Sequence, residues 1–187
     1  MRARLSTVLS LCVLSLMLPT TAIASANLIK NGGFKLGPTV GSGFATYAKG
    51  STAIPGWIVT MGTVDVLGSA WHDPDGDGRS IDLDGTRGPG AIAQAFATVP
   101  GVKYKVTFSL ASNPQCGPLV KRLTVTVGSV TKRYTFSSAK ASTSAMSWIE
   151  PTFPFVATAK TSTLTFTSTD PAGSLCGPAI DSVSVTR

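Results

Sequence analysis

Two runs of alternating apolar and polar residues flank a Gly-Ser pair in the segment Leu123-Thr124-Val125-Thr126-Val127-Gly128-Ser129-Val130-Thr131-Lys132-Arg133-Tyr134-Thr135-Phe136. A two-residue Gly-Ser loop suits a type II′ turn, so the runs are expected to pair as a hairpin, with Val125 opposite Lys132 and Leu123 opposite Tyr134. Because side chains alternate across a strand, the Val, Leu and aromatic side chains then share one face and the Thr and Arg side chains share the other. The segment therefore predicts a sheet with one face on a core and the other in water.

The same period of two recurs along the chain after residue 26, in short runs rich in Val, Thr, Ile and Phe that Gly, Pro, Asn and Ser clusters separate. No stretch after residue 26 keeps a helical period over three turns. The expected strands are Trp57–Thr60, Val64–Leu67, Ser80–Leu83, Ala91–Thr98, Tyr104–Ala111, Leu123–Val127, Val130–Phe136, Trp148–Ala157, Ser162–Ser168 and Ile180–Thr186. Strands this short and this numerous predict an all-β, two-sheet sandwich.

Residues 1–26 have the three parts of a secretory signal peptide. A basic start leads into an apolar run that ends at Leu18, and small residues follow, so cleavage is expected after Ala24 or Ala26. Residues 27–187 contain no linker or low-complexity segment and are expected to form a single β-sandwich domain with no membrane span. The mature protein is therefore expected to be secreted, either extracellular or periplasmic.

The charge balance is basic, with 16 Lys and Arg against 9 Asp and Glu and a formal net charge of +7. Loss of Arg2 and Arg4 with the signal would leave +5 on the mature chain. On an exported protein this charge does not indicate a nucleic-acid partner, and it suits either an anionic polysaccharide or solubility alone. The pairs Lys121-Arg122 and Lys132-Arg133 fall in the predicted hairpin, where they would meet an anionic glycan or form a solvated sheet edge.

Two cysteines remain once Cys12 leaves with the signal. Cys116 and Cys176 are each followed by Gly-Pro, which is typical of a turn. Two cysteines in an exported chain most simply form one disulfide, here closing a loop of about 60 residues. A catalytic thiol is disfavoured, because His72 is the sole histidine that could serve as its base.

The stretch from Asp73 to Asp84 is unusually acidic, with five aspartates in twelve residues. Carboxylates this close repel one another unless a hard cation binds between them. Asp73, Asp75, Asp77 and Asp84, with a glycine at the sixth position, match the spacing of a calcium loop. The match is imperfect, because the last ligand is Asp rather than Glu and the flanking elements are predicted strands. Calcium binding by these four aspartates, a solvated acidic turn and direct sugar contact all remain open.

Sugar binding needs an open aromatic face and a few fixed polar groups. Trp71 adjoins the acidic stretch and is the expected stacking platform, with His72 and Arg79 as polar contacts. Trp57 and Trp148 fall inside predicted strands and are expected to pack in the core.

Six blocks follow one another along the mature region: NLIKNGGF (27–34), IPGW (54–57), GTVD (62–65), SIDLDG (80–85), ASNP (111–114) and GPAIDSVSV (177–185). In this order they resemble the choice-of-anchor C family, which is related to the plant cell-wall proteins of the domain of unknown function 642. The resemblance implies a galactose-binding-like jelly roll, related to carbohydrate-binding modules, and a cell-wall or extracellular role without established catalysis.

Related carbohydrate-binding modules often hold a structural calcium, whose ligands include the Glu after the NGGF block and the Asp before the last strand. Asp181 is present in this chain, but Lys35 stands where that Glu would be. A lysine brings its own positive charge and no lone pair. This terminal site is therefore expected to be metal-free, with Lys35 near Asp181.

No nucleophile elbow, H-E-x-x-H motif, P-loop or dinucleotide fingerprint occurs in the chain. A glycosidase would need two suitably separated carboxylates, and Glu150 is the only glutamate. We therefore expect a secreted, non-catalytic carbohydrate-binding-like module that contacts a cell-wall or envelope polysaccharide. The alternatives are a structural or adhesive protein that binds other proteins, and a glycoside-acting enzyme that uses the aspartates.

Overall fold

The regular elements of the chain are all strands in the part that the structure, a computed structural model, describes: residues 26–187. The predicted signal peptide lies outside these residues, apart from Ala26. The strands are β1 (Phe44–Ala48), β2 (Ile58–Met61), β3 (Thr63–Leu67), β4 (Ser80–Asp82), β5 (Asp84–Gly85), β6 (Gly88–Pro89), β7 (Ala91–Ala97), β8 (Lys103–Ser112), β9 (Val120–Val127), β10 (Val130–Ser137), β11 (Thr152–Val156), β12 (Thr161–Ser168) and β13 (Pro178–Thr186). The all-β prediction is confirmed.

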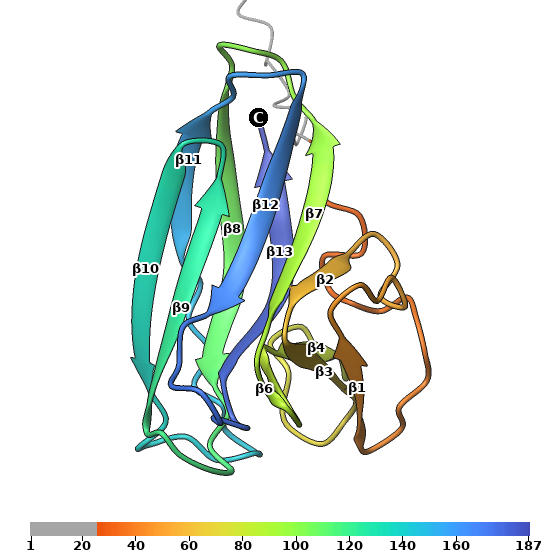
Figure 1. The fold of residues 1–187 in the computed structure, drawn as a ribbon, viewed down its shortest axis with the longest axis vertical. Coiled ribbons are helices and arrows are strands. Elements are labelled where there is room, and N and C mark those ends of the chain that lie inside the picture. The colour runs from red at the N-terminus through yellow and green to blue at the C-terminus, as the bar shows by residue number, and fades with distance from the viewer. Residues whose placement is uncertain (1–25) are drawn as a thin grey trace, which may run out of the picture.

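Two antiparallel sheets form the layers of a sandwich. Sheet A has the strand order β1-β3-β4-β13-β8-β11, sheet B has the order β10-β9-β12-β7-β2, and β5 and β6 form a small separate hairpin. In Figure 1 the strands of sheet B lie in front, with β8 and β13 of sheet A behind them. This arrangement confirms the predicted two-sheet sandwich.

The hairpin predicted for residues 123–136 has the predicted register. Val125 pairs with Lys132, and Leu123 pairs with Tyr134. Gly128 has a φ of 55°, the left-handed conformation that the first central position of a type II′ turn requires. The turn chemistry and the alternation of side chains therefore specify the same pairing.

Aromatic side chains join the two layers in the core. The ring of Trp57 lies 5.5 Å from that of Phe34 and 6.1 Å from that of Phe166, and Phe166 in turn contacts Phe108 with the ring centroids 5.0 Å apart. Trp57 is 3% exposed, so its predicted place in the core is confirmed. These ring contacts connect the segment before β1 to β12 of sheet B and β8 of sheet A.

The outer face of sheet A is partly covered by a second, smaller hydrophobic cluster. Its buried members are Leu67, Trp71, Ala111, Met146 and Ala179, and Trp148 packs against it. The cover consists of the loop that joins β3 to β4 and the segment that precedes β11. Between these covering segments the outer face of sheet A has hollows, and the candidate sites lie in them.

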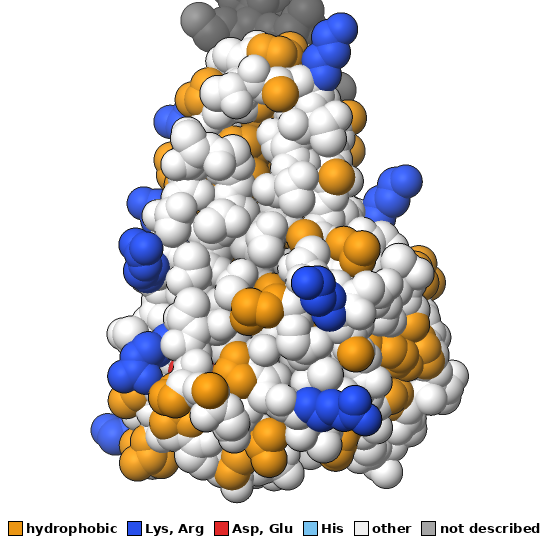
Figure 2. Space-filling view, viewed as in Figure 1, with side chains coloured by type: hydrophobic (Ala, Val, Ile, Leu, Met, Phe, Trp, Pro, Cys, Tyr) orange, Lys and Arg blue, Asp and Glu red, His pale blue; other side chains and the backbone are white. Residues whose placement is uncertain are grey.

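The outer face of sheet B is rich in threonine and is bordered by basic side chains. Figure 2 shows this face as mostly neutral, with Lys and Arg at its margins. Arg122 and Arg133 are exposed there, but Lys121 is only 1% exposed. This corrects the expectation that Lys121 belongs to a surface basic pair.

Cys116 and Cys176 form a disulfide with their Cα atoms 5.5 Å apart, as expected. It joins the loop after β8 to the loop before β13. The Nζ of Lys121 donates hydrogen bonds to the carbonyl oxygens of Cys116, at 2.9 Å, and of Cys176. The buried ammonium therefore satisfies carbonyl groups from both linked loops.

Two regions differ from the strand predictions. The strand β1 is not predicted from the sequence, and the strand predicted for Trp148–Ala157 begins only at Thr152. Ser147 has a left-handed φ of 56°, which turns the chain just before Trp148. As a result Trp148 is half-buried on the outer face of sheet A, which corrects its predicted place in the core.

No helix within residues 26–187 has the length and apolar character to cross a membrane.

Candidate functional site

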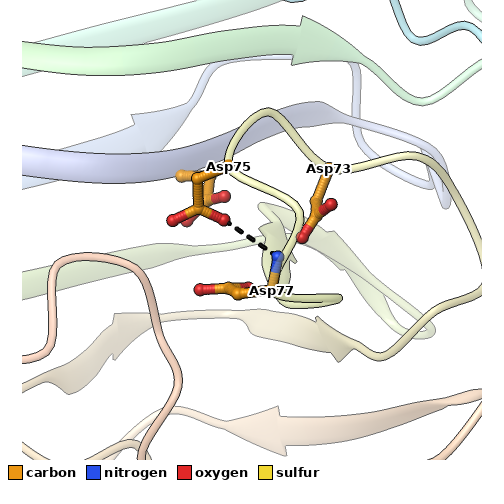
Figure 3. Close-up of side chains that lie close together, drawn as sticks. Asp73, Asp75 and Asp77 are labelled. Atoms are coloured by element: carbon orange, nitrogen blue, oxygen red, sulfur yellow. Dashed lines mark hydrogen bonds between the residues drawn. The ribbon is translucent and has the colours of Figure 1, made fainter.

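The acidic loop between β3 and β4 is folded by its own carboxylates. Asp75 Oδ1 accepts a hydrogen bond from the Asp77 N–H at 3.2 Å, Asp77 Oδ1 accepts one from the Arg79 N–H at 2.9 Å, and Asp73 Oδ2 accepts one from the Gly78 N–H. Gly76 and Gly78 have φ values of 79° and 75°, which L side chains rarely adopt. The alternation of Asp and Gly therefore bends the loop so tightly that three carboxylates lie together (Figure 3).

A fourth carboxylate joins this group from the far end of the chain. One oxygen each of Asp73, Asp75, Asp77 and Asp181 lies within 4.8 Å of the others. Asp181 is on β13, immediately before an irregularity in the pairing with β8. We call these four residues the aspartate group.

One oxygen of Asp181 has no hydrogen-bond partner. Its Oδ1 accepts a hydrogen bond from the Ser182 N–H at 2.6 Å, while its Oδ2 is buried without a partner. The whole residue is 0% exposed. Burial, and then the neighbouring charges of Asp75, Asp77 and Asp73, raise the pKa of Asp181 to about 8. The arrangement thus holds a carboxyl with an open acceptor position next to three others.

Within residues 26–187, the ion pairs that Asp75 and Asp77 form are with Lys35. Its Nζ lies 3.1 Å from Asp77 Oδ2 and 3.8 Å from Asp75 Oδ2. The hydrogen bond and the charge of Asp77 raise the pKa of Lys35. The lysine side chain is 60% exposed, so this pair is screened by solvent and offsets only part of the repulsion.

The structure merges two sites that the sequence analysis treats separately. Asp84 is outside the aspartate group, which corrects its predicted role as a calcium ligand. It is buried instead near Asp170 and Lys121, and a Cβ at Gly177 would be 2.6 Å from its Oδ1. Asp181 joins the loop aspartates in its place, so calcium in the loop and a metal-free Asp181 are opposite expectations for one group of side chains.

Trp71 has no open ring face. It is 4% exposed, and its Nε1 donates a 2.5 Å hydrogen bond to Ser80 Oγ on the outer face of sheet A. A ring packed against a sheet cannot stack on a sugar, which corrects the prediction that Trp71 is the platform. Arg79 is half-buried, and its backbone N–H caps Asp77.

Trp148 lies beside the predicted site instead. Its Nε1 donates a hydrogen bond to the carbonyl oxygen of His72 at 2.9 Å, which fixes the half-buried indole against the acidic loop. Sequence reasoning missed this residue because it falls in a run that alternates like a strand. Pro151, three residues after Trp148, is a local hint that the strand is interrupted there, because proline is disfavoured inside a sheet.

A hollow of about 550 Å³ opens between this indole and the acidic loop. Ser109 of β8 and Ser182 of β13 line it from the sheet. The other polar and aromatic residues around it are His72, Asp75, Ser147, Trp148 and Glu150. The hollow thus combines an indole with the sole histidine and the sole glutamate of the chain.

A separate buried carboxyl, Asp82, makes stability depend on pH. Burial raises its pKa to about 8, although Oδ1 accepts hydrogen bonds from the Asp84 and Gly177 N–H groups and Oδ2 accepts one from Asn113 Nδ2. In the unfolded chain an aspartate titrates near a pKa of about 4. The folded state therefore favours the protonated form, and its contribution to stability is full below pH about 4 and is lost as the pH rises through about 8.

Asp82→Asn should weaken this pH dependence. We expect the Tm of the unaltered protein, measured by circular dichroism with a chelator present, to fall between mildly acidic and mildly alkaline pH. The variant should fall less, because its side chain does not ionise and its oxygen still accepts from the two N–H groups. If the Tm of the two proteins fell equally with rising pH, Asp82 would ionise in the folded state as easily as in the unfolded chain.

The comparisons with known proteins cover nearly the whole described region. The model of the family described as "Protein of unknown function (DUF642)" matches residues 27–186. Halomucin of Haloquadratum walsbyi is 32% identical over an alignment of 169 residues, and the match covers 85% of this chain and 2% of halomucin. Protein TEEBE of Arabidopsis thaliana is 32% identical over an alignment of 180 residues, and the match covers 86% of this chain and 46% of that protein. The chain thus spans less than half the length of either curated relative.

Solved structures show the same fold at low identity. The arabinose-bound α-L-arabinofuranosidase MgGH51 superposes with a TM-score of 0.58 and 12% identity, over 87% of this chain and 26% of that chain. The module TmCBM61, solved in complex with β-1,4-galactotriose, superposes with a TM-score of 0.51 and 16% identity, over 87% of this chain and 99% of that chain. At these identities the likeness shows the sandwich fold alone.

Proposed function

The chain belongs to the DUF642 family, and from this membership we propose that it is an exported, non-catalytic module that binds a cell-wall or envelope polysaccharide. The finer relation to the choice-of-anchor C proteins remains a prediction from the sequence blocks. The disulfide supports export, because such bonds persist in oxidising compartments.

The observation that carries this proposal is the hollow beside Trp148. A sugar ring is held by an aromatic face together with a few fixed polar groups. Here the indole is fixed by its hydrogen bond to His72, and Ser109 and Ser182 are held by the strands of sheet A. The platform and the hydrogen-bonding groups are thus positioned before a ligand arrives.

The charges around the hollow favour a neutral polysaccharide over an anionic one. Asp75 and Glu150 both line it, and their carboxylates would repel a uronate polymer. Arg122 and Arg133 are exposed on β9 and β10 of sheet B, the other layer of the sandwich. Retention of the protein on its polysaccharide should therefore change little with added salt.

Two carboxyls in one hollow are also what a glycoside-acting enzyme requires. Asp75, however, is 3.8 Å from the ammonium of Lys35 and accepts a hydrogen bond within its own loop. These contacts hold the Asp75 carboxylate within its own loop, whereas a glycosidase needs both carboxyls placed on the glycosidic bond. We therefore propose binding without hydrolysis, and release of new reducing ends from a retained polysaccharide would contradict it.

Trp148→Ala should weaken retention on insoluble wall polysaccharides about tenfold, since loss of a ring contact costs on the order of 1.5 kcal/mol. Pull-down over a panel of plant and bacterial wall polysaccharides measures the effect. Trp148→Phe keeps a ring without the indole N–H and should retain most binding. Val99→Ala, at an exposed position away from the hollow, is the matched control.

Retention of the unaltered protein on no polysaccharide, at any salt concentration, would overturn the proposed function. Equal retention of Trp148→Ala and the unaltered protein would place the sugar elsewhere on the surface.

We also propose that the aspartate group binds calcium. The specific observation is the buried Oδ2 of Asp181, which has no partner and lies among three further carboxylates. Calcium takes several oxygen ligands in flexible geometry, and a loop of short carboxylates with a fixed strand aspartate suits it. Bound calcium would anchor the acidic loop to β13 and so hold one wall of the hollow.

A further inference from the structure

A second hollow, of about 330 Å³, lies on the outer face of sheet A beyond the Trp71 cluster. The strands β1, β3 and β4 form its floor, and the two loops that the disulfide joins form one wall. Leu67 lines this hollow and Met146 lines the first, and both belong to the small hydrophobic cluster that separates them. The two hollows are therefore distinct places on one face.

Two carboxyls lie side by side at the floor of this second hollow. Asp65 on β3 pairs directly with Asp82 on β4, and both side chains point away from the core. They are 7% and 2% exposed, and burial raises the pKa of each. A positive charge placed between the two carboxyls would favour their ionised forms, which burial alone disfavours.

The hollow itself supplies no cation. Its lining residues, all in the described part of the chain, include no Lys or Arg. Lys121 is a buried ammonium whose charge acts on Asp82, and its Nζ bonds to two carbonyl oxygens behind the disulfide. Asp65 is therefore the carboxyl of the pair that a cation in the hollow would neutralise.

Of the two carboxyls, Asp65 has the longer and weaker hydrogen bonds. Asp82 accepts three hydrogen bonds of 2.6–2.9 Å from Asn113, Asp84 and Gly177. Asp65 accepts from the N–H and hydroxyl of Thr86, both at 3.4 Å, and the hydroxyl of Thr46 also lowers its pKa through a hydrogen bond. Asp82 is thus fixed by its hydrogen bonds, whereas Asp65 can accept a shorter, charge-assisted hydrogen bond from a cationic donor in the hollow.

The walls are apolar and accessible. Phe44 is 56% exposed and Leu175 is 49% exposed, and both line the hollow together with the disulfide. An aromatic face attracts a cation as well as the C–H face of a sugar. Apolar walls around an acidic floor suit a small ligand that carries a positive charge on a compact carbon framework.

We propose that this hollow binds the protonated amine of an amino sugar, with the ammonium between Asp65 and Asp82 and the sugar ring against Phe44. A neutral sugar would form no charge-assisted bond with Asp65, and an anionic sugar would be repelled by the ionised carboxylate. The volume admits about one sugar unit at the lower limit of small-molecule sites. The proposal rests on the proposed function in taking the ligand to be a polysaccharide, but it concerns a different hollow.

The test compares a short glucosamine oligosaccharide with its N-acetylated counterpart, titrated by calorimetry below the pKa of the amine. The free amine should bind about tenfold or more tightly than the acetylated form, because a buried charge pair is lost on acetylation. Asp65→Asn keeps an oxygen for the Thr86 N–H and should abolish the preference. Phe44→Ala should weaken binding of the amino sugar, and Val156→Ala, exposed on β11, is the matched control.

Two outcomes would overturn the inference. One is equal binding, or no binding, of both oligosaccharides. The other is a preference for the amine that survives Asp65→Asn but disappears in Asp75→Asn, which would assign it to the aspartate group. Retention on a wall polysaccharide that depends on Trp148, without any preference for amino sugars, would leave the proposed function standing and remove only this inference.

Discussion

Replacement of both Cys116 and Cys176 by serine is expected to lower the Tm by on the order of 10 °C. The disulfide closes a loop with a sequence separation of 60 residues, for which the chain-entropy model gives about 4 kcal/mol. It also brings together the two carbonyl oxygens to which Lys121 donates, so its loss leaves a buried ammonium poorly satisfied. Thermal unfolding followed by circular dichroism measures the change.

Reduction of the unaltered protein should reproduce the shift seen in the serine variant, and reductant should leave the variant unchanged. A fall in Tm of less than about 3 °C would mean that the rest of the sandwich holds these two loops without the bond.

Calcium is expected to raise the Tm by a comparable amount, and Asp181→Asn to abolish the rise. A ligand present at about a thousand times its Kd stabilises the folded state by about 4 kcal/mol. Asp181 contributes the buried oxygen without a partner, and Asn at this position offers one neutral oxygen in place of a charged carboxylate. The measurement is the Tm with calcium and with a chelator, for both proteins.

The control is Asp170→Asn, which changes a buried carboxyl outside the aspartate group and should keep the calcium response. Lys35→Ala should strengthen calcium binding several-fold, because the ammonium 3.1 Å from Asp77 competes for the same carboxylates. An unchanged Tm in millimolar calcium for all of these proteins would instead support the expectation that Asp181 is metal-free.

The hairpin and the core could be predicted from the sequence because their signals are local. Gly128-Ser129 determines the turn, and the alternation from Leu123 to Phe136 determines the faces. The strand β1 gave no such signal. Its residues alternate between exposed and partly buried positions, so no apolar face marks it as a strand. An edge strand that is covered on one side lacks the difference between a buried and an exposed face by which a period of two is recognised.

The candidate site could be predicted only in part, because its residues come together through the fold. The loop spacing identified Asp73, Asp75 and Asp77, but Asp181 lies about a hundred residues further on and its contribution depends on sheet A. The choice between Trp71 and Trp148 also depended on tertiary packing. Met146 and Leu67 bury the first indole, and a left-handed turn at Ser147 brings the second beside His72.

Asp84 shows how a regular pattern fails at a strand break. Asp82 and Asp84 are two residues apart and would share a face in one continuous strand. The chain instead leaves β4 after Asp82 and enters a separate hairpin at Asp84. Asp82 therefore faces the second hollow, while Asp84 is buried near Lys121.

A backbone-amide NMR titration with a retained polysaccharide fragment tests most directly whether the outer face of sheet A is the binding face. The account predicts that the shifted amides cluster around His72, Asp75 and Trp148, and that they stay unshifted in Trp148→Ala. Shifts centred instead on Thr124, Thr126 and Arg133, across the exposed face of sheet B, would contradict it.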